Sequence, residues 1–330
     1  MDITSAPKND LIAGPPEVLV GTTWLEGISA APDGSLFFSD VRGNRLLRLS
    51  SSGLLTVFRS PSNYSNGTVF DSEARLVVCE EGDPEEGLPP RITRTDLRTN
   101  RIEVLVDNIA GRRLMGPNDV RVDRLGRLYF TDGARPFFLP PYGSGTSANG
   151  TSGAAIPTEA VPSTGVYRID PDGKVVQILA PPVTWQPNGL GISPDAKTFY
   201  LIENDIAADG LRQILAFDLH ADGAVANKRV LHDFRPGRSG DGMIVDAGGN
   251  LWVAAGLNFL RNTAETLATK AGIYIFTPAG KTLDFVPIPE DTVTNLTFGS
   301  VDRGIVYITA GKTVYKLSTH SAGIPIMPAN

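Results

Sequence analysis

The stretch GPNDVRVDRLGRLYFTDG, residues 116–133, decides how this chain is expected to fold. Apolar and polar residues alternate up to Asp123, and a segment rich in aromatic residues follows Gly126. Strands favour both features, and Asp and Gly favour the tight turn between them. The stretch therefore predicts a β-hairpin, and it raises the question why a polar pair, Asn118 and Asp119, begins the first strand.

This hairpin is one of six similar segments along the chain. After each hairpin comes a third apolar segment, and in most repeats a fourth follows. A unit of four antiparallel strands that is repeated six times predicts an all-β fold, the six-bladed β-propeller. The six hairpin segments are residues 26–40, 66–80, 118–132, 188–203, 241–255 and 295–310.

The last repeat ends after its third strand, and an extra apolar segment, residues 17–20, precedes the first repeat. We predict that this segment pairs with residues 312–317 and closes the ring of blades. Closure would remove an exposed sheet edge. The chain, residues 1–330, is then expected to form a single propeller domain.

Residues 134–163 lie between the third hairpin and its next strand and are rich in Gly, Pro, Ser and Thr. This composition predicts a loop without regular structure. Two interpretations remain open, a surface insertion and a lid over a pocket, because long loops are often either disordered or functional. Phe137, Phe138 and Tyr142 favour the lid.

Each hairpin segment begins with a residue that carries a side-chain carboxylate or amide. The innermost strand of a propeller blade lines the central channel, so these residues are expected to form a ring of oxygen atoms at one mouth. Such a ring suits a hard divalent cation. The alternative is that the Asn and Asp residues only form turns. The six residues are Glu26, Asn66, Asn118, Asn188, Asp241 and Asn295.

The predicted metal ligands are two carboxylates, which would neutralise the ion, and two amides. Because the ring contains no His or Cys, Ca²⁺ is the favoured ion, and Mg²⁺, Mn²⁺ and Zn²⁺ are the alternatives. The three histidines, at positions 220, 232 and 320, are expected on outer strands or near the end of the chain. The four ligands are Glu26, Asn118, Asn188 and Asp241.

Asn66, Asn118 and Asn295 are predicted to bind the substrate. Trp24 and Trp185 stand just before Glu26 and Asn188, where they could wall the pocket or pack in the core. A further set of polar residues lies where second strands end, at the same mouth as the ring. They are expected either to support the ring and face the substrate or to cap the hairpins. This set is Asp40, Glu80, Asp132, Glu203, Asn204 and Asp205.

Composition and motifs exclude several functions. The formal net charge of −6 provides no basic surface for nucleic acid. No apolar run reaches the roughly 18 residues of a membrane span and no signal core is seen, so a cytoplasmic protein without a membrane partner is expected. The single cysteine, Cys79, is expected to be a buried, unreactive thiol. No P-loop or dinucleotide motif occurs, and Ser239 has no nearby His for a catalytic triad.

Four phrases carry a family resemblance: LEGISAAPDGSLFFSDVRGNRLLRL, GPNDVRVDRLGRLYFTD, QPNGLGISPDAKTFYL and GDGMIVDAGGNLWVA. Together they resemble the gluconolactonase/senescence-marker-protein (regucalcin-like) family of six-bladed propeller hydrolases. The resemblance implies that Glu26, Asn188 and Asp241 bind the metal, that Asn118 binds metal or substrate, and that Asp241 is a general base. One departure is Gly116, where members that act on sugar lactones often have an Arg.

These observations predict a metal-dependent hydrolase that opens a small-molecule lactone or ester. The cation would polarise the carbonyl group, and either Asp241 or the cation itself would activate the attacking water. Three alternatives remain: an organophosphate or activated-ester hydrolase, a biosynthetic lyase, isomerase or cyclase, and a non-catalytic binding platform. The sequence does not predict an oligomeric state.

Overall fold

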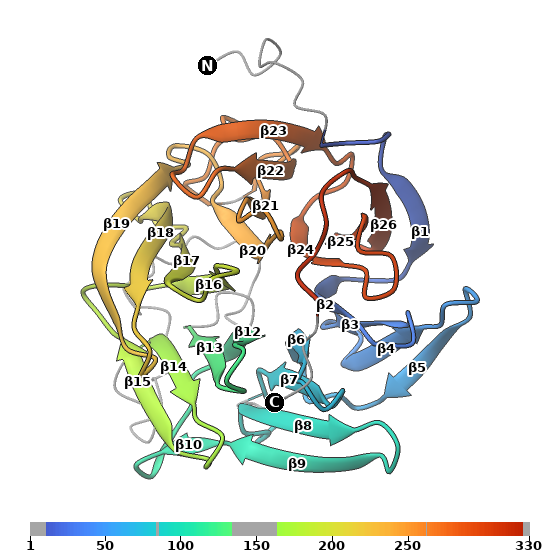
Figure 1. Ribbon diagram of the computed structural model, residues 1–330, viewed down its shortest axis with the longest axis vertical. Helices are drawn as coiled ribbons and strands as arrows, with labels where there is room; N and C mark the ends of the chain where they lie inside the picture. Colours follow the sequence, from blue (N-terminus) through green and yellow to red (C-terminus); the bar gives the residue numbers. More distant parts are fainter. Residues whose placement is uncertain (1–10, 84–85, 134–163, 262, 326–330) are drawn as a thin grey trace.

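The computed structural model describes residues 11–83, 86–133, 164–261 and 263–325. Six four-stranded antiparallel sheets surround a central axis, as Figure 1 shows. The all-β, six-bladed propeller predicted from the repeats is therefore confirmed. The described residues form no helix, and so none that is long and apolar enough to cross a membrane.

The first three blades follow the predicted repeats, each running outward from the axis. Blade 1 consists of β2 (Leu25–Ala30), β3 (Leu36–Asp40), β4 (Arg45–Leu49) and β5 (Leu55–Arg59). Blade 2 consists of β6 (Ser65–Phe70), β7 (Leu76–Glu80), β8 (Arg91–Asp96) and β9 (Arg101–Val106). Blade 3 consists of β12 (Pro117–Val122), β13 (Leu128–Asp132), β14 (Gly165–Ile169) and β15 (Val175–Leu179).

The next two blades have the same order of strands. Blade 4 consists of β16 (Pro187–Ile192), β17 (Thr198–Asn204), β18 (Arg212–Leu219) and β19 (Val225–Asp233). Blade 5 consists of β20 (Gly240–Val245), β21 (Leu251–Ala255), β22 (Gly272–Phe276) and β23 (Thr282–Pro287). A short hairpin that the sequence did not predict, β10 (Asn108–Ile109) with β11 (Arg112–Arg113), connects blades 2 and 3.

Blade 6 closes the ring by joining the two ends of the described chain. Its strands are β24 (Val293–Phe298), β25 (Ile305–Ala310), β26 (Thr313–Ser318) and β1 (Glu17–Gly21). Strand β1 pairs antiparallel with β26, from Glu17 opposite Lys316 to Gly21 opposite Thr313. The predicted closing strand is confirmed, with both segments within one residue of the expected bounds.

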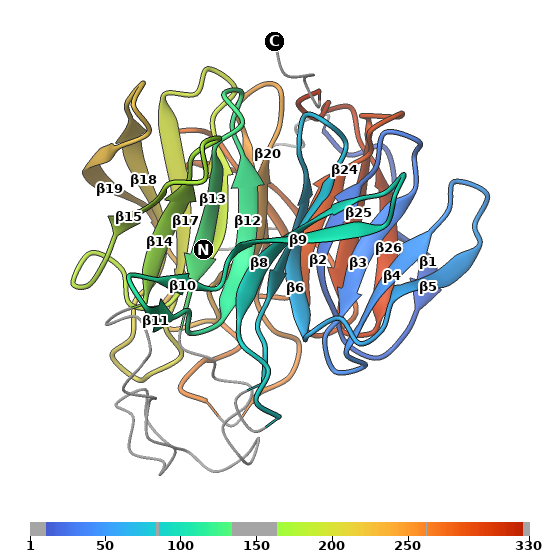
Figure 2. The ribbon, with the colours of Figure 1, turned by 90° about the horizontal axis from the view of Figure 1, so that it is seen from below.

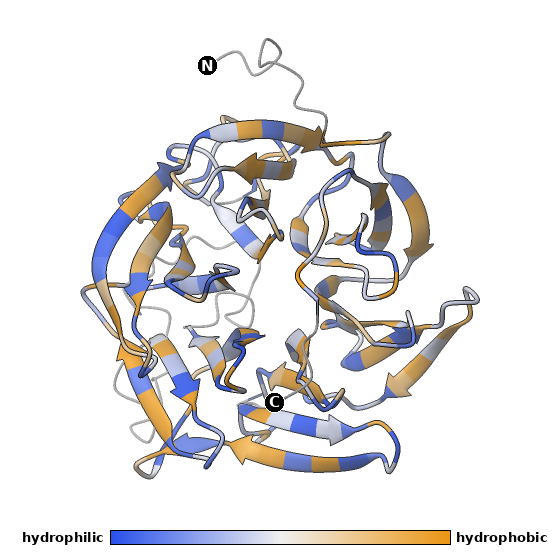
Figure 3. Ribbon diagram, in the orientation of Figure 1, coloured by the Kyte–Doolittle hydropathy of each residue, from blue (hydrophilic) through white to orange (hydrophobic). Residues whose placement is uncertain are grey.

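The hydrophobic cores lie between adjacent blades, because each strand presents alternate side chains to the two faces of its sheet. One core joins Trp252 of blade 5 to Leu296 and Ile308 of blade 6, and all three are 0% exposed. Another joins Leu25 of blade 1 to Val314 of blade 6. Outermost strands such as β9 and β15 contain both apolar and polar residues, which Figure 3 shows as changing colours along each ribbon.

Candidate active site at one end of the propeller axis

The innermost strands run in one direction along the axis, so their first residues lie at the same end (Figure 2). In five blades the predicted ring residue directly follows the first ladder pair of the innermost strand. The ladder shifts register at this point in each of these blades, as a β-bulge does when it redirects a side chain. The five residues are Glu26, Asn66, Asn118, Asn188 and Asp241.

Glycines at the bulges bring the innermost strands into direct contact. A Cβ atom on Gly27 would lie 2.2 Å from the carbonyl oxygen of Asn66 in the next blade. A Cβ atom on Gly189 would lie 2.3 Å from the carbonyl oxygen of Asp241. Only glycine permits such an approach, and the contact sets neighbouring ring residues side by side.

The structure corrects the position of Asn295. In blade 6 the first ladder pair is Val293 with Ala310, and the register shifts before the next pair, Asn295 with Thr309. Thr294 is therefore the first bulge residue, at the level of the ring, and Asn295 is the second. The hairpin turn of this blade is longer than in blade 1, and the sequence alignment followed the residue type instead of the register.

Asn295 instead matches Asp119, the second bulge residue of blade 3. The backbone N–H of each donates to a threonine hydroxyl of the adjacent strand, at 3.1 Å and 3.0 Å respectively. Blades 3 and 6 are opposite, and the Asn295 side chain meets the Asp119 carboxylate. Arg121 pairs with the same carboxylate at 2.8 Å and donates to the carbonyl oxygen of Met243 in blade 5. These contacts link blades 3, 5 and 6 across the axis beneath the ring.

Carboxylates cluster around Glu26, which is 7% exposed. Burial raises the pKa of Glu26 well above its ordinary value, and the neighbouring carboxylates of Asp241, Glu81 and Asp119 raise it further. The nearby guanidinium of Arg238 acts in the opposite direction on this pKa. Buried carboxylates that repel one another in this way fit the donor set of a divalent cation.

Asp241 is held by a buried guanidinium. Arg238 Nη2 donates to Asp241 Oδ2 in an ion pair, and Arg238 Nη1 donates to the carbonyl oxygen of Val293 at 3.3 Å. Burial raises the pKa of Asp241, while Arg238 and Arg261 counteract this rise. Arg238 was not predicted as a site residue, although it directly precedes Ser239, which was considered for a catalytic triad.

Asn66 is oriented by a second residue that sequence analysis missed. Its Nδ2 donates to Glu81 Oε1 at 2.7 Å. The amide nitrogen is therefore engaged, which leaves Oδ1 as the atom available to a ligand. Glu81 could have been found from the sequence, because Glu80 and Glu81 form an acidic pair at the end of the second hairpin. Only Glu80 was named as a candidate.

The carboxylates at the ends of second strands have a structural role. Asp132 accepts hydrogen bonds from the backbone N–H groups of Met115 (3.0 Å) and Gly116 (2.7 Å). Glu203 accepts in the same way from Trp185 (2.8 Å) and Gln186 (2.7 Å). They hold the segments that lead into Asn118 and Asn188, so the capping interpretation is confirmed for them.

Their burial excludes the substrate-facing alternative for four of these residues. Asp40, Glu80, Asp132 and Glu203 are each 0% exposed. Asp40 accepts from the backbone N–H of Trp24 at 3.2 Å, whereas Glu80 binds the side chains of Arg91 and Thr93, both at 2.6 Å. Burial raises the pKa of Asp132 to about 6, although its two backbone hydrogen bonds oppose the rise.

Large side chains stand at the same end as the ring. Trp185 is 52% exposed, so it is no core residue. The Trp24 ring lies beneath Arg42, whose Cζ is 5.0 Å from the ring centroid. Phe259 and Leu260, in the loop after β21, are 71% and 68% exposed.

Other predicted residues lie away from the ring. Cys79 is buried, and burial raises its thiol pKa well above the ordinary value, which agrees with an unreactive core residue. His232 lies on the outermost strand β19, and His220 and His320 follow β18 and β26. The predicted insertion, residues 134–163, lies outside the described residues. In the described ranges no group of three or more His, Cys, Asp or Glu could by itself hold a metal ion, so a cation would need the amide oxygens.

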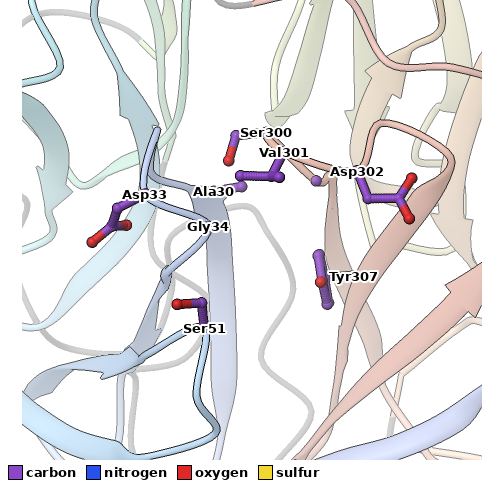
Figure 4. A pocket seen from close by; sticks show the side chains of 9 residues that line it. Ala30, Asp33, Gly34, Ser51, Ser300, Val301, Asp302 and Tyr307 are labelled. Carbon is purple, nitrogen blue, oxygen red and sulfur yellow. The ribbon is translucent and has the colours of Figure 1, made fainter.

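A cavity of about 240 Å³ lies at the opposite end of the axis, between blades 1 and 6 (Figure 4). It is lined by residues that include Ala30, Asp33, Ser300 and Tyr307. Glu26 lies near the start of β2 and Ala30 is its last residue, so this cavity is separate from the ring.

Comparisons with known proteins show the family of this chain and agree with its fold. Residues 21–312 match the family model described as the SMP-30/Gluconolactonase/LRE-like region. A gluconolactonase of Zymomonas mobilis is 28% identical, over 96% of this chain and 86% of its own. The structure of a Xanthomonas campestris gluconolactonase superimposes with a TM-score of 0.71 at 27% identity, over 96% of this chain and 99% of that one. The calcium-binding regucalcin of Agrobacterium tumefaciens, 17% identical with a TM-score of 0.69 over 97% and 98% of the two chains, shares the fold.

Proposed function

This chain belongs to the SMP-30/gluconolactonase/LRE-like family, and from that premise we propose that it is a divalent-cation-dependent hydrolase that opens a small-molecule lactone. The reaction would take place at the end of the axis where the ring residues lie. The similarity to two gluconolactonases over nearly the whole chain supports the reaction class.

The observation that carries the proposal is the cluster of buried carboxylates around Glu26. Asp241, Glu81 and Asp119 all oppose the negative charge on Glu26, and Arg238 favours it. An ion with two positive charges would relieve this repulsion. Glu26, Asn118, Asn188 and Asp241 would hold it, and this set of oxygen donors suits Ca²⁺ best.

When bound, the cation would polarise the lactone carbonyl and stabilise the negative charge that develops on its oxygen. Asp241 would accept a proton from the water whose oxygen forms the new bond to the carbonyl carbon. The C–O bond inside the lactone then breaks, and the oxygen that leaves the carbonyl carbon takes up a proton, so that the product is a hydroxy acid. Asn66 and Asn118 would orient the substrate through their amide groups.

The surroundings of the ring support access from one side. Contacts of Asp119, Arg121 and Asn295 cross the axis beneath the ring, which supports an approach of the substrate from the end where the strands begin. Trp24 and Trp185 stand at that end and would contact the substrate. The bulge glycines and the buried carboxylates would keep the ring residues in fixed positions.

The test is acid release measured in a pH-stat with a panel of lactones, simple esters and an activated phosphotriester. We expect lactones to be hydrolysed fastest, loss of activity after EDTA treatment, and recovery on addition of Ca²⁺. Preference for the phosphotriester would assign the protein to the organophosphate alternative. Hydrolysis of no substrate, with Ca²⁺ binding intact, would favour a binding platform, and activity that survives chelation would contradict the cation.

A further inference from the structure

Arg238 is a buried cation beside the ring, and its exposed fraction is 3%. Its guanidinium donates to Asp241 Oδ2 through Nη2 and to the carbonyl oxygen of Val293 through Nη1, at 3.3 Å in the second case. Val293 begins β24 in the neighbouring blade. The guanidinium is therefore fixed from two blades and has little freedom to move away from Asp241.

Blade 5 differs from blades 1 to 4 in the residue that pairs with the first residue of its innermost strand. In those four blades the residue opposite the first residue of the innermost strand is a carboxylate, and in blade 5 it is Ala255, opposite Gly240. The four carboxylates are Asp40, Glu80, Asp132 and Glu203. Blade 5 thus lacks a carboxylate at this position, and its buried guanidinium, Arg238, contacts the ring residue itself.

We propose that Arg238 is a positioning residue for Asp241, an inference that rests on the proposed function above. Because Arg238 binds Oδ2, Oδ1 is the oxygen of Asp241 left for a cation or a water molecule in the ring. Asp241 is thereby held as a single-oxygen donor and kept from binding an ion through both oxygens. The positive charge of Arg238 also repels a bound cation, so Arg238 orients Asp241 at the expense of cation affinity.

The decisive variant is Arg238→Met, which removes the charge and keeps much of the length of the side chain. Calorimetric titration with Ca²⁺ alone should show binding about tenfold tighter than in the wild type, because a nearby like charge is gone and Asp241 gains a second free oxygen. At saturating Ca²⁺, kcat should fall at least about tenfold with KM little changed, because the carboxylate is no longer oriented. The Ca²⁺-induced rise in Tm should exceed that of the wild type.

Two further variants serve as controls. Arg59→Met removes another arginine whose partner carboxylate is buried, since Arg59 pairs with Glu80 at 2.8 Å and neither residue belongs to the ring. It should lower Tm but leave Ca²⁺ affinity and the Ca²⁺-induced rise in Tm unchanged. Arg238→Lys keeps the charge, so its Ca²⁺ affinity should stay within about threefold of the wild type and part of kcat should return.

Weaker Ca²⁺ binding in Arg238→Met, or full recovery of kcat at high Ca²⁺, would overturn the proposal and leave Arg238 with a role in folding only. If Arg238→Met does not fold even with Ca²⁺, Arg238→Gln replaces it in the same titration, because Gln keeps a hydrogen-bond donor without charge. Absence of Ca²⁺ binding in the wild type would instead contradict the proposed function. Equal Ca²⁺ affinity in wild type and variant would contradict this inference alone.

Discussion

Asp119 of blade 3 and Asn295 of blade 6 meet across the propeller axis, one residue deeper than the ring. Burial raises the pKa of Asp119, and the side chains of Arg121 and Asn295 counteract the rise. Two opposite blades thus share one buried polar contact. Removing this contact therefore tests how much a polar contact across the axis contributes to the stability of the fold.

Asn295→Ala removes the amide that meets Asp119 and leaves a buried carboxylate with fewer partners. We expect the free energy of unfolding to fall by about 1–3 kcal/mol, measured by urea denaturation. The matched control is Asn108→Ala, which removes an exposed Asn–Asp contact of 2.7 Å with Asp107 and should change stability by less than about 0.5 kcal/mol. Equal losses in the two variants would contradict a special role for the axial contact.

Deletion of residues 1–21 removes strand β1, which pairs with β26 from Glu17 to Gly21. Val20 also packs against the core between blades 1 and 6. We expect Tm to fall by at least about 5 °C and aggregation on heating to increase, because the edge of β26 becomes exposed. Deletion of residues 1–10 is the control. If the protein without residues 1–21 kept the Tm of the full chain, ring closure would not be a source of stability.

Asp241→Asn separates proton transfer from cation binding. The change keeps the size and one oxygen donor but removes the negative charge, so kcat should fall by about two to four orders of magnitude at saturating Ca²⁺. Asn188→Ala should mainly weaken Ca²⁺ binding, with activity that recovers as Ca²⁺ is added. If added Ca²⁺ fully restores Asp241→Asn as well, Asp241 is a ligand and no general base.

Asp132 should make stability depend on pH in a defined direction. Burial raises its pKa to about 6 in the folded protein, above an ordinary value near 4. The folded state therefore favours the protonated form, and this contribution is fully present below about pH 4 and is lost as the pH rises through about 6. Relative to Asp132→Asn, the wild type should lose about 3 kcal/mol of unfolding free energy between pH 4 and 7. Parallel stability curves for the two proteins would contradict the raised pKa.

Trp185 is 52% exposed at the end where the ring lies, and its backbone is held by Glu203. Trp185→Ala should raise KM for bulky lactones by about 3–10-fold, because an aromatic contact is worth roughly 0.5–1.5 kcal/mol. Its Tm should change little, as expected for an exposed side chain. The control is Val301→Ala, since Val301 is 73% exposed and lines the cavity at the opposite end. An unchanged KM with a lowered Tm would assign Trp185 to packing.

Much of the candidate site was predictable from residue order. The ring positions of Glu26, Asn66, Asn118, Asn188 and Asp241 follow from the repeats, because each residue begins a hairpin whose two strands are adjacent in the chain. The hairpins also predict which second-strand ends return to the ring. Such inferences need only local pairing, which alternation and turn residues determine.

The same local logic failed for Asn295, where a longer turn shifted the alignment by one residue. The side chains that hold the ring residues could not be predicted in this way either. Glu81 and Arg238 were not predicted, although their neighbours Glu80 and Ser239 were considered. The orientation of a side chain at a bulge depends on the neighbouring blade, and no repeat pattern records that contact.

The sequence by itself determined the six blades, the closing strand and the carboxylate or amide residues near the start of five innermost strands. Only the tertiary structure decided which side chains meet at the axis, such as Arg121 and the carbonyl group of Met243, which are 122 residues apart. The physical reason is closure of the ring. Strand pairing is specified by neighbours along the chain, whereas the distances across the axis are set when the six blades pack together and bring distant bulges into contact.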